Sequence, residues 1–158
     1  RYPDGRGVMI MPVVVAGHIG GGTFFVRYTN QDGVSGRQTP QHVMGTQIVN
    51  GTIITSAGAV AKSCAPFMAL QEGDSGVRTI DSVVFEGTGD IGLISLALVK
   101  PLAESYIRET TAPHERDFAM DMGALPIIED DAYLNLLCLP VGTLSGAQIM
   151  GYIKTLFV

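Results

Sequence analysis

The sequence is poor in charge: of its 158 residues, 10 are Lys or Arg and 15 are Asp or Glu, 16% in all. A soluble domain ordinarily carries about a quarter charged residues. The mean hydropathy is positive, at +0.30, and a domain of this size has too much surface to bury all its apolar residues in its own core. The scarcity of charge therefore predicts that other protein copies cover part of the surface.

Positive charge is the scarcer sign, since the net charge is −5 and the ten basic residues are scattered singly along the chain. Binding to the phosphates of nucleic acid requires clustered Lys and Arg, so we expect no nucleic-acid partner. Long apolar runs are also missing. The run at residues 8–16 contains Pro12 and is far shorter than the roughly 20 residues of a membrane-spanning helix, so we expect no membrane partner.

Cysteine is rare and tryptophan is absent. The two cysteines, Cys64 and Cys138, lie in apolar surroundings and lack the spacing of a metal site. We expect buried thiols, because free cysteine behaves as a small hydrophobic residue, and the sequence leaves a disulfide between them open. The absence of tryptophan argues against a carbohydrate-binding module, since such modules often use aromatic platforms.

The chain does contain short apolar stretches separated by turn-forming residues. Asn50-Gly51, between β-branched residues, is a strong hairpin signal, and clusters of Gly, Asn and Asp separate the other stretches. This pattern favours one all-β domain over residues 1–158, an antiparallel, jelly-roll-like β-sandwich. The predicted strands are residues 8–16, 23–28, 47–55, 67–71, 77–85, 91–99, 133–139 and 148–157.

Two of these predicted strands lack a polar face. Residues 91–99 and 133–139 are apolar on both sides, which is typical of strands that are covered twice, whereas residues 148–157 alternate. Residues 101–110 fit either a short helix or a strand, and residues 110–131 indicate an extended irregular segment. We expect neighbouring subunits or crossing loops to cover the two apolar strands.

The motif Gly73-Asp-Ser-Gly76 has the composition that surrounds the nucleophile of chymotrypsin-like serine proteases. That chemistry needs a histidine base beside the serine and an aspartate that orients the histidine. With His42 as the base, no aspartate outside the motif intervenes before Ser75. With His18 as the base, Asp32 is the only aspartate outside the motif that lies before Ser75. A whole barrel would then have to fit into the segment between His18 and Ser75. We interpret the motif as a turn.

The glycine-rich segment before Thr23 has the composition of a phosphate-binding loop but lacks its motif. The glycines between Gly17 and Thr23 lack the Gly-Lys-Ser/Thr of a phosphate-binding loop, and a strand rather than a helix follows them. We interpret them as a strand connection.

The acidic triplet Glu129-Asp130-Asp131 offers oxygens of the kind that bind Ca²⁺. Adjacent acids in an extended chain point to opposite sides, however, so Asp117 and Asp121 would have to join them. We interpret the triplet as a solvated turn and His114 as a surface loop residue. His18 and His42 have no partner pattern for catalysis or metal binding, and the sequence predicts no catalytic, cofactor-binding or metal-binding residue.

Four stretches of the C-terminal half follow one another in an order with a known counterpart. They are Asp74-Ser-Gly-Val-Arg-Thr-Ile-Asp-Ser-Val-Val-Phe85, Leu96-Ala-Leu-Val-Lys-Pro-Leu102, Pro126-Ile-Ile-Glu-Asp-Asp-Ala-Tyr-Leu-Asn-Leu137 and Leu139-Pro-Val-Gly-Thr-Leu-Ser-Gly146. In this order residues 74–158 resemble small virion structural proteins of tailed bacteriophages. The resemblance implies a β-sandwich that decorates or cements a capsid, or builds part of a neck or tail, and it implies no active site.

We therefore expect a non-enzymatic, homo-oligomeric subunit located in a bacteriophage virion. Capsid decoration or cementing is favoured, with copies of the chain and other virion proteins, such as the major capsid protein, as partners. Two alternatives stay open: a neck or tail subunit, and a carbohydrate- or receptor-binding β-sandwich. The second alternative requires exposed aromatic residues, for which Tyr28 and Tyr152 are the candidates.

Overall fold

The computed structural model describes residues 2–17, 22–43, 50–51, 53, 66–87, 92–107, 112–122, 125–138, 150–151 and 153–155. Their secondary structure consists of β1 (Met9–Ala16), β2 (Thr23–Asn30), β3 (Arg37–Gln38), β4 (His42–Val43), β5 (Val77–Glu86), β6 (Leu93–Val99) and α1 (Phe118–Met122). All strand pairs are antiparallel. The prediction of an all-β fold is confirmed.

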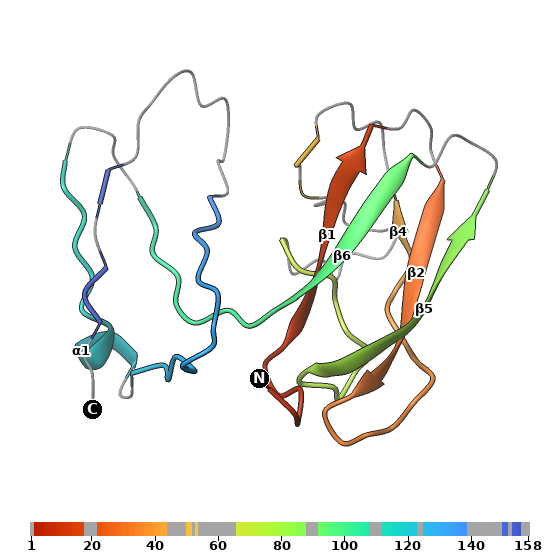
Figure 1. The fold of residues 1–158 in the computed structure, drawn as a ribbon, viewed down its shortest axis with the longest axis horizontal. Coiled ribbons are helices and arrows are strands. Elements are labelled where there is room, and N and C mark those ends of the chain that lie inside the picture. Colours follow the sequence, from red (N-terminus) through yellow and green to blue (C-terminus); the bar gives the residue numbers. More distant parts are fainter. Residues whose placement is uncertain are drawn as a thin grey trace.

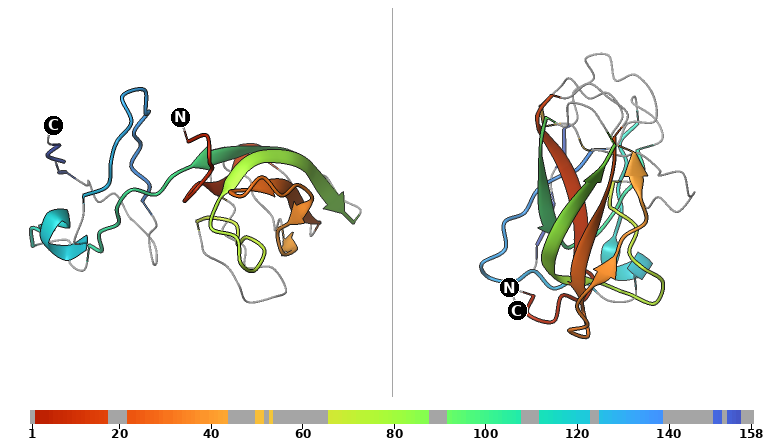
Figure 2. Two further views of the ribbon diagram at one scale, coloured as in Figure 1. Left: turned by 90° about the horizontal axis from the view of Figure 1, so that it is seen from below. Right: turned by 90° about the vertical axis from the view of Figure 1, so that its right-hand side faces the viewer.

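The strands form two sheets, which the ribbon shows one behind the other (Figures 1 and 2). In the four-stranded sheet β2 is central: β5 pairs with one side of it, and the short strands β3 and β4 pair with the other side. In the two-stranded sheet β1 pairs with β6, from Met9 opposite Val99 to Ala16 opposite Leu93. We call this two-sheet unit the sandwich.

The core lies between the two sheets. Ile10 and Val14 of β1 meet Phe24, Val26 and Tyr28 of β2, and all five side chains are buried. Burial alternates along most of β1 because successive side chains of a strand point to opposite faces. Met68, Val77, Leu70, Ile80, Val83, Ile94 and Leu96 complete the packing around these residues.

Four of the predicted strands are confirmed. Residues 8–16, 23–28, 77–85 and 91–99 correspond to β1, β2, β5 and β6. Of residues 67–71, only Phe67 makes a bridge, so that strand prediction is wrong for the rest of the segment. Most of residues 47–55 lie outside the described part, in which Ile53 bridges to Val13.

Two predicted strands near the C-terminus are wrong where the structure describes them. None of residues 133–138, 150–151 or 153–155 is in a strand. A strand needs a hydrogen-bonded neighbour for its backbone groups, and no described strand lies beside residues 133–138. Residues 101–107 are neither helix nor strand, and the described part of 110–131 is irregular apart from α1, which was not predicted.

After β6 the chain leaves the sheets. Figure 1 shows residues 101–107, 112–122 and 125–138 beside the sandwich, with α1 among them. We call these three segments the arm. None of the helices in the described part of the chain is long and apolar enough to cross a bilayer.

Candidate interaction surface

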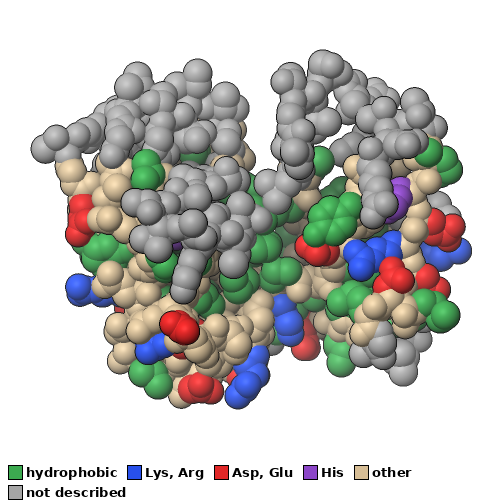
Figure 3. All heavy atoms as spheres, turned by 180° about the vertical axis from the view of Figure 1, so that it is seen from behind, with side chains coloured by type: hydrophobic (Ala, Val, Ile, Leu, Met, Phe, Trp, Pro, Cys, Tyr) green, Lys and Arg blue, Asp and Glu red, His purple; other side chains and the backbone are tan. Residues whose placement is uncertain are grey.

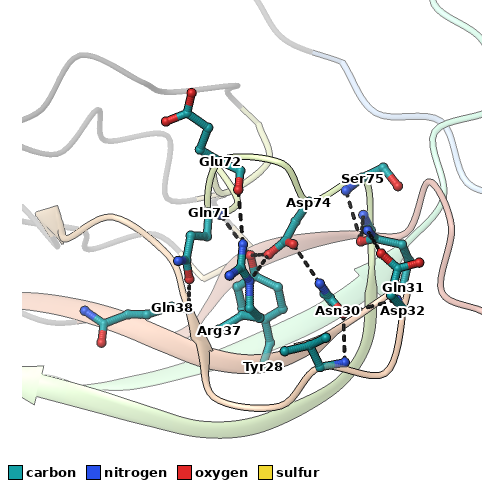
Figure 4. A network of polar contacts seen from close by, with 12 residues as sticks. Tyr28, Asn30, Gln31, Asp32, Arg37, Gln38, Gln71, Glu72, Asp74 and Ser75 are labelled. Carbon is teal, nitrogen blue, oxygen red and sulfur yellow. Dashed lines mark hydrogen bonds and ion pairs between the residues drawn. The ribbon is translucent and has the colours of Figure 1, made fainter.

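The Gly73-Asp-Ser-Gly76 motif forms a turn that is tied to the end of β2 (Figure 4). The Asp74 side chain is 2% exposed and lies against Arg37 of β3, which donates from Nε to the carboxylate at 2.8 Å. The Tyr28 hydroxyl donates to the same carboxylate at 2.6 Å, and Asn30 Nδ2 donates at 2.8 Å. The buried charge is therefore neutralised and fully hydrogen-bonded, as a buried carboxylate requires.

These contacts shift the ionisation of both acidic groups. Burial alone would raise the pKa of Asp74, but hydrogen bonds from Arg37, Tyr28 and Asn30 outweigh it and hold the pKa below its usual value. Burial, reinforced by the hydrogen bond to Asp74, raises the pKa of the Tyr28 hydroxyl above its usual value. Asp74 is therefore a carboxylate and Tyr28 a neutral phenol across the physiological pH range.

Backbone contacts complete this tie. The N–H groups of Ser75 and Gly76 both donate to Gln31 Oε1, at 3.0 and 3.2 Å. A Cβ on Gly76 would lie 2.0 Å from the carbonyl oxygen of Gly5, so only glycine allows the N-terminal segment to cross here. The turn thus ties the end of β2, the strand β3 and the N-terminal segment together, and we call it the Asp74 clasp.

The described residues do not assemble a protease triad. Asp74 is bound to Arg37 rather than to a histidine, and His42 is buried beside the ring of Phe24 at a centroid distance of 5.9 Å. His18 lies outside the described residues. The interpretation of the motif as a turn is confirmed.

The acidic candidates on the arm bind groups within the arm. The Ala132 N–H donates to the carbonyl of Glu129 at 2.9 Å, which closes the expected turn. Asp117 accepts from the Ala119 N–H at 3.0 Å, whereas Asp121 pairs with Arg116 at 2.9 Å. Within the described ranges, no three His, Cys, Asp or Glu side chains are grouped as metal ligands.

An open hollow of about 500 Å³ lies on the arm. Arg116 and Asp121, which line it, are paired with each other, and Arg116 also donates to the Glu104 carbonyl. His114 is exposed there, as expected of a loop residue. The remaining lining residues are Tyr106 and Glu115.

The remaining candidate residues are placed differently from expectation or lie outside the described residues. Cys138 is an exposed free thiol, so the prediction that it is buried is wrong. Tyr28 is completely buried, so it offers no platform to a sugar. Cys64, Tyr152 and residues 18–21 of the glycine-rich segment lie outside the described residues, while Thr23 begins β2 as expected.

The arm exposes many apolar side chains. Tyr133 is 91% exposed and Leu136 is 73% exposed. Figure 3 shows hydrophobic side chains interspersed with charged ones at the surface of this region. The other large apolar residues of the arm that are exposed are Tyr106, Ile107, Met120, Met122, Leu125, Ile127, Ile128, Leu134 and Leu137.

The β1–β6 sheet also presents an apolar outer face. Ile94 and Leu96 of β6 pack on the core, so the alternate positions of this strand point outward. Leu93 at its start is 56% exposed. Sequence patterning identified the missing polar face of β6, but it missed the Asp74 clasp, whose residues come from distant parts of the chain.

No family model, curated protein or solved structure matches this chain.

Proposed function

We propose that this protein is a non-enzymatic structural subunit of a bacteriophage virion, present in many copies, that decorates or cements the capsid. The observation that carries the proposal is the exposure of the arm. Its apolar side chains lie in an irregular chain with almost no secondary structure. Exposed apolar surface rimmed by polar residues is typical of sites that bind other proteins.

The charge distribution of the chain supports an assembly role. The polar groups that the sandwich buries near Asp74 are paired with one another, so they hold the fold together instead of facing a ligand. On the arm, large apolar side chains are exposed to solvent. Interfaces of about 1,600 Å² each, repeated around a symmetric particle, give a stability that no single contact provides.

The location in a virion is supported by the resemblance of residues 74–158 to small virion proteins of tailed bacteriophages. The complete burial of Tyr28 weakens the carbohydrate-binding alternative. An apolar arm is compatible both with a position on the capsid and with a position in the neck or tail. Locating the subunit in the particle distinguishes the two alternatives.

Two measurements test this function. Light scattering on the purified chain should give a mass above the 16.7 kDa of one copy. A gold-labelled antibody against the chain should bind capsids in phage particles released from cells that carry its gene. Label at the neck or tail would overturn the decoration role, and particles without label would overturn the virion role.

A further inference from the structure

We propose that the outer edge of β6 receives residues 133–138 of a second copy as an additional antiparallel strand. The proposal rests on the proposed role of the protein as an assembling subunit. It identifies β6 and residues 133–138 as the surfaces that two copies use to contact each other. It joins two features that have no partner among the described residues: the outer edge of β6 and the strand-like segment 133–138.

In the part of the chain that the structure describes, β6 pairs with β1 alone, and no described strand lies along its other edge. Exposed edges attract further strands, and proteins block them with charged residues or bulges. β6 has the sequence LISLALV, with no charge.

The edge strand of the other sheet shows the protection that β6 lacks. β5 pairs with β2 alone, and it carries Arg78, Asp81 and Glu86. A register shift leaves Asp81 as an extra residue opposite the Arg27–Tyr28 step, which is a bulge with a charged side chain. Among the described strands, β5 is therefore an edge strand with a charged bulge, whereas β6 is an edge strand that carries neither a charge nor a bulged residue.

Residues 133–138 have the character of the missing strand. Their sequence, YLNLLC, contains no charge and has the apolar composition of β6. They lack a strand partner among the described residues, and Leu134 and Leu136 are 52% and 73% exposed. A conflict between local preference and adopted structure is expected where the partner is supplied by another molecule.

The position of Asn135 determines which side of residues 133–138 faces the core. Leu134, Leu136 and Cys138 share one side of an extended segment, and Asn135 lies on the other. The apolar side fits the core face of β6, where Ile94 and Leu96 lie. Asn135 then points outward, because burying its amide without partners would be unfavourable.

Charge at the ends selects the antiparallel direction. Lys100 follows β6, and its Nζ lies 4.3 Å from the ring centroid of Tyr2. The acidic residues Glu129 and Asp130 precede the arm segment. In an antiparallel pair the start of one strand lies beside the end of the other, so Tyr133 opposite Val99 places these acids near Lys100.

The arm lies beside its own sandwich instead of along β6. Figures 1 and 2 show the chain running away from the sheets after β6, with α1 farther out. Arg116 holds a bend in this path through Asp121 and the Glu104 carbonyl. This path favours a second copy over the same chain as the source of the strand.

Matched serine variants of the full chain test the edge. Ser95 of β6 and Ser82 of β5 are both exposed residues of edge strands. Ser95→Lys should reduce the mass measured by light scattering toward the 16.7 kDa of one copy, because the lysine blocks the outer edge of β6. Ser82→Lys should leave the mass unchanged, and circular dichroism should show both variants folded.

Leu136→Pro tests the other partner, because proline removes a backbone donor and is poorly tolerated within a sheet. It should reduce the mass as Ser95→Lys does. An oligomer that survives both variants would overturn the strand pairing while leaving the proposed function intact. A wild-type chain that is monomeric at every concentration would overturn both.

Disulfide trapping identifies which copy supplies the strand. In a Cys64→Ala, Cys138→Ala background, copies with Ala97→Cys are mixed with copies that carry Asn135→Cys. Mild oxidation should give a dimer on a non-reducing gel, and Ser82→Cys in place of Ala97→Cys should not. If the mixture gives no dimer, but one chain carrying both substitutions cross-links to itself, the strand comes from the same chain and the second-copy assignment is overturned.

Discussion

In the sandwich, Ile10 and Phe24 are completely buried between two sheets, whereas in the arm Tyr133 and Leu136 are 91% and 73% exposed. Ion pairs differ in the same way. Asp74 of the sandwich pair is 2% exposed, and Asp121 of the arm pair is 47% exposed. The centre of the sandwich thus buries its apolar side chains and pairs its buried charge, while the arm leaves large apolar side chains exposed among the described residues.

The largest expected effect on stability comes from the centre of the sandwich. Phe24→Ala removes a fully buried ring and should lower the free energy of unfolding by about 3–5 kcal/mol, measured by urea denaturation. Leu136→Ala is the matched change in the arm and, at a concentration where the chain is monomeric, should lower it by less than about 0.5 kcal/mol. Equal losses would show that the arm belongs to the same folding unit.

The second-largest difference is expected between the two ion pairs, in the free energy of unfolding that each contributes. Arg37→Gln leaves the Asp74 carboxylate buried without its cation, and we expect a loss of about 3 kcal/mol in the free energy of unfolding. Arg116→Gln breaks a pair at the surface and should cost less than about 1 kcal/mol. A loss for Arg116→Gln that matches the Arg37→Gln loss would mean that the arm pair is buried in solution.

Acid should weaken the sandwich through Asp74. The pKa of its carboxyl is lower in the folded chain than its ordinary value, so its stabilising effect is present above about pH 4 and is lost as the pH falls through the folded pKa. Asp74→Asn should lower stability at pH 7 and flatten this dependence. Thermal unfolding between pH 7 and pH 2 measures both, and an unchanged slope in the variant would contradict the assignment.

The elements that could be predicted from sequence are those with a long periodic signal. β1, β2, β5 and β6 each extend over at least seven residues, whereas β3 and β4 have two residues each and carry no measurable period. α1 has five residues and no buried side chain. Short elements are fixed by the neighbours that the fold brings to them, and a local pattern does not contain those neighbours.

The clasp and the arm escaped prediction for different reasons. Tyr28, Arg37 and Asp74 are distant in the sequence, and the turn motif around Asp74 suggested catalysis more readily than an ion pair with β3. Residues 133–138 have the composition of a strand, but composition does not state whether a partner strand lies in the same chain. Both predictions would have required the tertiary contacts of these residues, which a local sequence pattern does not contain.

The most direct test of the account is hydrogen exchange at residues 133–138 as a function of protein concentration. If a second copy covers this segment, its amides should exchange rapidly in dilute solution and become protected as the chain assembles, together with β6. The amides of β2, central in its sheet, should be protected throughout. Protection of residues 133–138 that does not change with concentration, or no protection in the assembled protein, would contradict the account.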